Sequence, residues 1–121
     1  MPPKKTVNEW LDAIERVESG GDLDAIGDEN AKGGPSRGPL QISRPYWTDA
    51  GMTIGVYENC WGPTAHFYSR LVVLCYMLRY CPAALAGRDW ETCSRIHNGG
   101  PSGAKKKATL GYWEKVKKAL G

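Results

Sequence analysis

The segment "RVESGGDLDAIGD", residues 16–28, holds the side chains of this chain that best fit acid–base chemistry. Glu18 stands at the end of an apolar helical pattern, and the glycines at 20 and 21 are typical of a helix end. A carboxyl there meets the negative end of the helix dipole, and the apolar stripe one turn earlier also disfavours the anion. A protonated carboxyl can act as a general acid near neutral pH. The alternative is an exposed glutamate at an ordinary helix end.

A second carboxylate is available in the loop that follows. Its acidic residues are Asp22, Asp24, Asp28 and Glu29. Glycoside hydrolysis uses a loop carboxylate that stays ionised opposite a protonated one. The protonated group donates to the leaving oxygen, and the anion activates water, or stabilises or attacks the oxocarbenium-like centre. An ordinary solvated loop is equally rich in acids, so composition does not identify the partner of Glu18.

Aromatic side chains and one histidine add to this picture. The chain has five Trp and six Tyr but one Phe, which favours rings that stack on sugars and also hydrogen-bond, although such rings also pack in cores. Tyr46–Trp47 and Tyr112–Trp113 put neighbouring rings on different helix faces, so one of each pair is expected in the core. His97, beside Asn98, fits catalysis, substrate binding or a structural helix end.

The elements that must position these residues are mostly helices. Residues 6–17 form the first, because Thr6 and Glu9 fit a capping box and an apolar face follows it. Residues 22–38 are rich in turn formers and predict a loop or small β-hairpin. A further helix is expected to begin near Pro39, with Pro45 breaking or restarting it.

The C-terminal half continues in the same way. The strongest helical pattern covers residues 62–81, begins at Pro63 and is apolar nearly all round, which is typical of a central buried helix. Asp89 fits the N-cap of a short helix that ends at His97, and the residues 98–103 form a loop. The last amphipathic helix covers residues 109–120. The prediction is a mainly α fold with one small hairpin, in a single domain over residues 1–121.

Composition limits the class of partner. The chain has 121 residues, 41% hydrophobic residues and a net charge of +3, which is ordinary for a soluble globular protein, and we expect a monomer. The basic runs at 105–107 and 115–118 are compatible with an anionic polymer as substrate but are too sparse for a nucleic-acid binder. No apolar run is long enough to span a membrane. The start, "MPPKKTVNEW", lacks the apolar core of a secretion signal, which fits an internal protein or a mature form.

The four cysteines permit two disulfides in three connectivities, which sequence alone does not distinguish. They are Cys60, Cys75, Cys81 and Cys93. Their spacings do not resemble a zinc site, and only two histidines are present. We therefore expect two buried thiol pairs, reduced or oxidised, and neither a metal nor another cofactor.

Several motifs together resemble the invertebrate-type lysozyme, or destabilase, family. "VESG" followed by "GPLQISRPYWTDAG" is similar to its catalytic-acid and core signatures, and "CSRIHNGGPSG" with "TLGYWEKV" is similar to its C-terminal signature. The pattern "ESGG…AIGD…GPLQI" also resembles goose-type lysozymes and lytic transglycosylases. The resemblance implies a secreted protein with a lysozyme-like fold that cleaves the β-1,4 bond between N-acetylmuramic acid and N-acetylglucosamine in peptidoglycan. Chitin oligosaccharides are a related substrate class.

The resemblance also implies roles for particular residues. Glu18 matches the general acid, and Asp28 matches the second carboxylate of the broader pattern, with Glu29 as the runner-up. The loop "GDENAKGGPSRGP" departs from the family in length and sequence, and the chain has fewer cysteines than the family usually has. The positions that match groove-lining motifs are Gln41, Tyr46, His97, Asn98 and Tyr112.

Two other functions fit parts of the pattern. An isopeptidase would use a nucleophile near His97, with Ser36, Ser94 or Ser102 as candidates, although no nucleophile-elbow motif is present. A non-catalytic module that binds peptidoglycan or chitin would need only the groove. A lytic transglycosylase would act on the same substrate. The sequence gives no carboxylate separation, so it leaves retention and inversion open.

Overall fold

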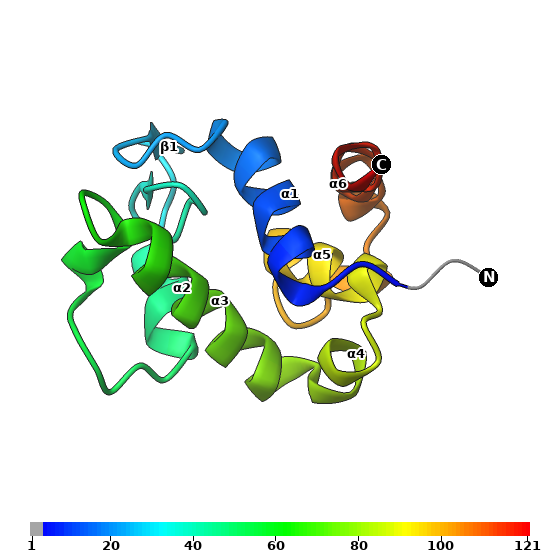
Figure 1. Ribbon diagram of the computed structural model, residues 1–121. Helices are drawn as coiled ribbons and strands as arrows, with labels where there is room; N and C mark the ends of the chain where they lie inside the picture. The colour runs from blue at the N-terminus through cyan, green and yellow to red at the C-terminus, as the bar shows by residue number, and fades with distance from the viewer. Residues whose placement is uncertain (1–3) are drawn as a thin grey trace. The chain divides into compact units, whose positions relative to one another are not determined.

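The computed structural model describes residues 4–121 and divides the chain into two compact units (Figure 1). Unit 1 consists of Met1–Val17, of which residues 4–17 are described, together with Met77–Gly121. Unit 2 is the continuous segment Glu18–Tyr76. Most of the described chain is helical, with a single small sheet, so the predicted mainly α class is confirmed.

Helix α1 (Val7–Ser19) begins with the capping box that the sequence predicts. The backbone N–H of Thr6 donates to the Glu9 carboxylate over 2.8 Å, and the Glu9 N–H donates to the Thr6 hydroxyl over 3.2 Å. These hydrogen bonds stabilise the ionised form and hold the pKa of Glu9 below its ordinary value. The helix ends where Gly20 adopts a φ of +66°, a conformation that costs glycine little. The predicted end at residue 17 is therefore two residues short.

The core of unit 1 is built around two stacked tryptophans. Trp10 of α1 and Trp90 of α5 (Trp90–Gly99) have ring centroids 5.0 Å apart and an interplanar angle of 8°. Both rings are buried, yet neither indole N–H is left without an acceptor. Trp10 donates to the Ser94 hydroxyl over 2.9 Å, and Trp90 donates to the Lys5 carbonyl over 2.8 Å. The stack therefore joins α1 to α5 without the cost of an unpaired buried donor.

The remaining elements of unit 1 pack around α5. Helix α4 (Pro82–Ala86), the short 3-10 helices η2 (Gly103–Lys105) and η3 (Lys107–Thr109), and α6 (Leu110–Leu120) all contact it. Asp89 caps α5 as predicted, because its carboxylate accepts from the backbone N–H of Thr92 over 3.2 Å. Arg16 of α1 donates to the Ala119 carbonyl over 3.0 Å, which places a cation at the C-terminal end of α6.

Unit 2 contains the predicted hairpin. Strands β1 (Ile26–Gly27) and β2 (Ser36–Arg37) pair antiparallel, with Ile26 opposite Arg37 and Gly27 opposite Ser36. Helix α2 (Arg44–Asp49), the 3-10 helix η1 (Tyr57–Cys60) and most of α3 (Ala65–Tyr80) complete the unit. The buried Tyr57 connects these parts, because its hydroxyl donates to the Ile42 carbonyl over 2.8 Å.

The prediction of a helix start near Pro39 is wrong. Pro39 lies in a turn in which the Gln41 N–H donates to the Gly38 carbonyl over 3.1 Å. Arg37 and Ile42 then pair through an antiparallel bridge, so the chain reverses direction where a helix was expected. Gly38 has a φ of +77°, and a Cβ at this position would collide with the Cys60 carbonyl oxygen. The helix begins instead after Ser43, whose hydroxyl caps α2, and Pro45 sits in its first turn.

Helix α3 is less buried than its apolar composition predicts. One face is enclosed, and its buried residues are Ala65, Tyr68, Ser69, Val72, Val73, Tyr76 and Met77. Phe67 and Leu78, in contrast, are 73% and 59% exposed. The enclosed residues recur at helical spacing, so a stripe rather than the whole circumference packs on neighbours. Within residues 4–121, no helix has the length and apolar character needed to cross a membrane.

All four cysteines are free thiols in the structure. Cys60 and Cys75 belong to unit 2, whereas Cys81 and Cys93 belong to unit 1. Burial raises the pKa of the Cys60 thiol to about 12. The Cys60 thiol is therefore protonated at neutral pH. Because Cys60 and Cys75 are both free thiols, no disulfide bond constrains unit 2.

Candidate active site

Glu18 lies in the last turn of α1, and its side chain is half-buried. The next residue fixes this helix end to a turn within unit 2. The Ser19 hydroxyl donates to the Pro39 carbonyl over 2.8 Å and accepts from the Gly21 N–H over 3.1 Å. A single serine thus satisfies a donor beyond the helix and anchors the helix end to the turn at 38–41. Sequence reasoning missed Ser19, although a hydroxyl between a glutamate and two glycines is a recognisable signal.

Asp28 follows β1 directly and has an exposed side chain. Its φ of +52° is left-handed, a conformation that aspartate adopts more readily than most residues. Its Oδ2 accepts a hydrogen bond from the Ser36 hydroxyl over 3.3 Å, and its carbonyl accepts from the Ala31 N–H over 2.9 Å. The carboxylate is therefore oriented by the opposite strand. Glu29, the runner-up, is also exposed.

Gln41 braces the hairpin against the turn. Its side-chain amide donates to the Gly38 carbonyl over 3.0 Å and to the Ala25 carbonyl over 3.3 Å. The Gly38 N–H also donates to the Ala25 carbonyl, over 2.8 Å. A Cβ on Gly27 would collide with the Gln41 Oε1, so a side chain at this position would displace the Gln41 amide. The backbone of this frame connects the helix end at Glu18 with the strand that precedes Asp28. The predicted contact of Gln41 with substrate stays a prediction.

Unit 2 also contains a pair of stacked tyrosines and a cation–π contact. The half-buried Tyr46 stacks on the buried Tyr76, with centroids 3.8 Å apart and an interplanar angle of 7°. The Arg37 guanidinium lies 3.8 Å from the centroid of the Trp61 ring, a cation–π contact next to β2. The expectation that one of Tyr46 and Trp47 is a core residue is wrong, since both are half-buried. The Trp47 indole N–H donates to the Tyr68 hydroxyl over 3.0 Å.

The remaining predicted site residues belong to unit 1. His97 of α5 is buried, and its ring lies 6.4 Å from the ring of Tyr112 at an angle of 40°. Tyr112 and Trp113 are both half-buried, so the prediction that one ring of this pair lies in the core is also wrong. Asn98 is exposed. Ser94, one nucleophile proposed for an isopeptidase, is fully buried beneath Trp10 and accepts its indole N–H. Ser94 is therefore a structural residue.

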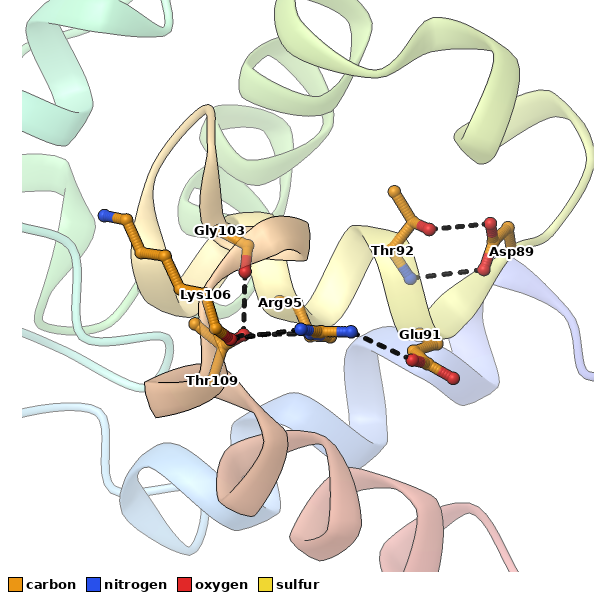
Figure 2. Close-up of polar contacts among 7 residues, drawn as sticks. All are labelled: Asp89, Glu91, Thr92, Arg95, Gly103, Lys106 and Thr109. Carbon is orange, nitrogen blue, oxygen red and sulfur yellow. Dashed lines mark hydrogen bonds and ion pairs between the residues drawn. The ribbon is translucent and has the colours of Figure 1, made fainter.

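A polar network anchors the loop that follows His97 and Asn98 (Figure 2). Arg95 donates through Nε to the Thr109 hydroxyl over 2.9 Å and through Nη2 to the Lys106 carbonyl over 3.0 Å. Thr109 is buried and donates in turn to the Gly103 carbonyl over 2.7 Å. The Lys106 ammonium donates to the Gly99 carbonyl over 2.7 Å. These contacts fix the backbone of residues 99–109, and a Cβ on Gly103 would collide with the Arg95 carbonyl oxygen.

Sequence reasoning missed Arg95 and Thr109 as well. Arg95 also pairs with Glu91, one turn earlier, over 3.1 Å. That contact was readable from the i, i+4 spacing of the two residues, whereas the contact with Thr109 depends on how the loop folds back. Both residues support the segment that carries His97 and Asn98.

This fold, with an acidic helix end connected to a small hairpin, is the architecture of a lysozyme. The crystal structure of Tapes japonica lysozyme has 31% sequence identity and a TM-score of 0.74, and the match covers 98% of this chain and 94% of that chain. A lysozyme of Meretrix lusoria is 35% identical over 111 residues, which covers 92% of this chain and 88% of the relative. An invertebrate-type lysozyme of Ruditapes philippinarum is 36% identical over 106 residues, which covers 88% and 76%. No family model matches the chain.

The chain therefore belongs to the invertebrate-type lysozyme family, a family of glycoside hydrolases. Both the mainly α fold and the motif resemblance agree with this assignment.

Proposed function

We propose that this chain is a muramidase that cleaves the β-1,4 bond between N-acetylmuramic acid and N-acetylglucosamine in bacterial peptidoglycan. Glu18 is the general acid and Asp28 is the second carboxylate. The observation that carries the proposal is the hydrogen bond from Ser19 to Pro39, because it ties the acid-bearing helix end to the turn that braces the hairpin. Membership in the lysozyme family supports the same reaction.

The two carboxyl groups have surroundings that suit different tasks. Glu18 is half-buried at the C-terminal end of α1. Asp28 is exposed, and its carboxylate accepts a hydrogen bond from the Ser36 hydroxyl of the opposite strand. Glu18 donates its proton to the glycosidic oxygen as the bond to the anomeric carbon breaks. Asp28 supports the positive charge that develops on the sugar ring, and water completes the hydrolysis.

The other residues serve binding. Tyr46, Gln41, His97, Asn98 and Tyr112 contact the glycan through ring stacking and hydrogen bonds in this proposal. The proposed substrate is the polymer of the bacterial cell wall, so in this proposal the enzyme is secreted and acts outside the cell that makes it. We also propose that it acts as a monomer. An anionic wall is attracted to the exposed lysines at 105–107 and 115–118.

The test is the hydrolysis of purified peptidoglycan by wild type, by Glu18→Gln and by the control Asp24→Asn. We expect Glu18→Gln to lower the rate about 1000-fold, the scale of general acid catalysis, while circular dichroism shows an unchanged fold. Asp24→Asn removes an exposed carboxylate of the same loop and should stay near wild type. Mass spectrometry of the products should show reducing ends. Anhydro-muramic ends would indicate a transglycosylase, and cut cross-links would indicate a peptidase.

The second carboxylate is tested by a matched pair, Asp28→Asn and Glu29→Gln. The two residues are adjacent and exposed, but only Asp28 has a hydrogen bond to Ser36 among the contacts that the structure records. We expect a loss of about 100-fold in Asp28→Asn, within the range of catalytic carboxylates. A loss confined to Glu29→Gln would contradict the assignment of Asp28 and leave that of Glu18 standing. The anomer of the first product distinguishes retention from inversion.

A further inference from the structure

Two arginines of unit 2 lie against aromatic rings and have no acidic partner. We propose that Arg37 and Arg44 form a binding site for a carboxylate of the peptide stems that branch from the peptidoglycan strand. This site rests on the proposed function, because the stems belong to the same substrate. It lies within unit 2, as does the proposed second carboxylate, Asp28.

The two guanidinium groups are arranged around one aromatic cluster. The Tyr57 ring is central, because its centroid lies 5.1 Å from that of Trp61 and 6.3 Å from that of Trp47. The guanidinium carbon of Arg37 lies 3.8 Å from the Trp61 centroid, and that of Arg44 lies 4.9 Å from the Tyr57 centroid. Stacking on an aromatic face holds a guanidinium in place and leaves the N–H groups at its edge available to an acceptor.

The backbone brings the two arginines together. Arg37 of β2 and Ile42 exchange two backbone hydrogen bonds, over 3.0 Å and 2.9 Å, and Arg44 follows only two residues after Ile42. The Tyr57 hydroxyl donates to the same Ile42 carbonyl over 2.8 Å, and Tyr57 is buried. The two cations are therefore held by strand pairing and by a buried ring.

These cations have no counter-charge from the protein. Across residues 4–121, neither Arg37 nor Arg44 is in an ion pair with a carboxylate. Glu58, which follows Tyr57 in the chain, forms no such pair with either of them. The Nε of Arg37 is buried and has no hydrogen-bond partner in this part of the chain. Buried polar groups are normally paired, so two neighbouring cations without a carboxylate indicate that the anion comes from outside the protein.

The chemistry of the guanidinium group defines the class of anion. Its planar array of N–H donors matches the two oxygens of a carboxylate. The Nε of Arg37 is buried, whereas its terminal nitrogens are not, so Nη1 and Nη2 are the donors that meet the anion. In peptidoglycan the carboxylates belong to the peptide stems, and the sugar chain of chitin has none. The site therefore distinguishes a strand that carries stems from a neutral sugar polymer.

The position of the cluster suits a stem that extends from a bound sugar chain. Arg37 is the residue after Ser36, whose hydroxyl contacts the Asp28 carboxylate. Successive side chains of a strand point to opposite faces, so an anion at Arg37 does not compete with a sugar at Asp28. An extended peptide spans up to about 3.5 Å per residue, so three stem residues reach about 10 Å from the sugar. A strand bound at Asp28 can therefore place a stem carboxylate at Arg37.

Chemical amidation of the substrate provides the test, because it removes the carboxylates and leaves the sugar chain intact. Peptidoglycan freed of phosphate polymers is used in its native form and after conversion of its carboxyls to amides. The ratio of kcat/KM for the two substrates is measured at about 0.5 M salt, where long-range attraction by the lysines of unit 1 is screened. We expect the wild type to prefer the native substrate about 10-fold, the scale of one charge-assisted contact.

Matched variants show whether the arginines cause this preference. The double variant Arg37→Gln with Arg44→Gln should lower the ratio to about 1. The control Lys32→Gln removes an exposed cation of the same unit and should keep the ratio near that of the wild type. Arg37→Lys keeps the charge but loses the planar set of donors, so it should lower the ratio in part. Because each ratio compares two substrates of one variant, a loss of folded protein cancels. An unchanged ratio in the double variant, or equal rates of the wild type on both substrates, would overturn the proposal.

A binding assay separates this site from the proposed reaction. Co-sedimentation of Glu18→Gln with native and amidated peptidoglycan, at the same salt, should show a preference for the native polymer. Adding Arg37→Gln and Arg44→Gln to this variant should remove the preference. Full activity of Glu18→Gln would contradict the proposed general acid and would leave the sedimentation result standing. Equal sedimentation with both polymers would overturn the arginine site, whatever the rate of hydrolysis.

Discussion

The two units of the chain are stabilised in different ways. In unit 1 the stabilising contacts are made by side chains. Two indole rings stack and the Trp10 N–H donates to Ser94, and Arg95 of α5 donates a hydrogen bond to Thr109 at the end of the loop that follows this helix. In unit 2, which also contains most of α3, the segment around the proposed carboxylates consists of turns and a hairpin of two-residue strands. The difference indicates that side-chain contacts stabilise the core of unit 1, while the backbone of unit 2 sets the geometry of the proposed carboxylates Glu18 and Asp28.

Backbone strain follows the same division. Three non-glycine residues of the described chain have positive φ, namely Asp28, Gln41 and Arg88. Asp28 and Gln41 belong to unit 2 and lie in the frame of the proposed site. Each left-handed residue costs of order 1 kcal/mol, and such strain persists only where the surroundings impose it. Unit 2 therefore gives up some stability for the positions of a few side chains.

The largest effect on stability is expected for Trp10→Ala. The change removes the stack on Trp90, opens a cavity and leaves the buried Ser94 hydroxyl without its donor. The free energy of unfolding, measured by chemical denaturation, should fall by about 4 kcal/mol. Activity per folded molecule at low temperature should change little if the Trp10 side chain contributes stability alone. Trp10→Phe keeps an aromatic ring and should cost less; equal losses would contradict the cavity argument.

A smaller loss of stability but a larger loss of activity is expected for Gly38→Ala. The residue has a φ of +77°, and the added Cβ would collide with the Cys60 carbonyl. Unfolding free energy should fall by about 3 kcal/mol, and peptidoglycan hydrolysis per folded molecule should fall about 10-fold as the brace at Gln41 shifts. The control is Gly34→Ala, since Gly34 also has positive φ but open space around it. Gly34→Ala should cost about 1 kcal/mol. Equal activities of Gly38→Ala and Gly34→Ala would contradict the proposal that the backbone of unit 2 positions the catalytic carboxylates.

The smallest effect is expected for Glu9→Gln and appears as a pH dependence. The capping box lowers the folded-state pKa of Glu9 below its ordinary value of 4.5, so the charge contributes stability above that pH. The contribution is lost as pH falls through the lowered pKa. The difference in thermal midpoint between wild type and Glu9→Gln should therefore be largest at neutral pH and vanish in acid. A difference that grows in acid would contradict the capping geometry, and activity at neutral pH should be unaffected.

The helices were predictable because their signals are local. The capping box at Thr6 and Glu9, the N-cap at Asp89 and the apolar face of α1 depend on residues within one or two turns. The turn at Pro39 could not be predicted in the same way. Proline is common at the start of both helices and turns, and which of the two forms depends on contacts with residues far along the chain. Gly38 lies against the Cys60 carbonyl, 22 residues later, and no local rule contains that contact.

The candidate site divides in the same way. Glu18 could be proposed from a helix end and a motif, and Asp28 from a Gly-Asp pair. For Gln41 the sequence predicted only a contact with substrate, which stays a prediction; the hydrogen bonds of its amide to Ala25 and Gly38 were not predicted. Arg95 and Thr109 could not be found, since their contact forms only after the loop between them closes. Residue types thus indicate chemistry, while supporting contacts require the fold.

The division of the chain also separates its charge. Unit 1 contains 12 of the 16 basic residues and 6 of the 13 acidic residues, so its net charge is +6, while that of unit 2 is −3. The net charge of +3 for the whole chain is the sum of these two opposite values. Long-range attraction to an anionic polymer therefore comes from the lysines around α6, and mobile ions screen it over about 10 Å. We therefore expect ionic strength to act first on the encounter between enzyme and wall, and to leave the proton transfer that we propose for Glu18 largely unscreened.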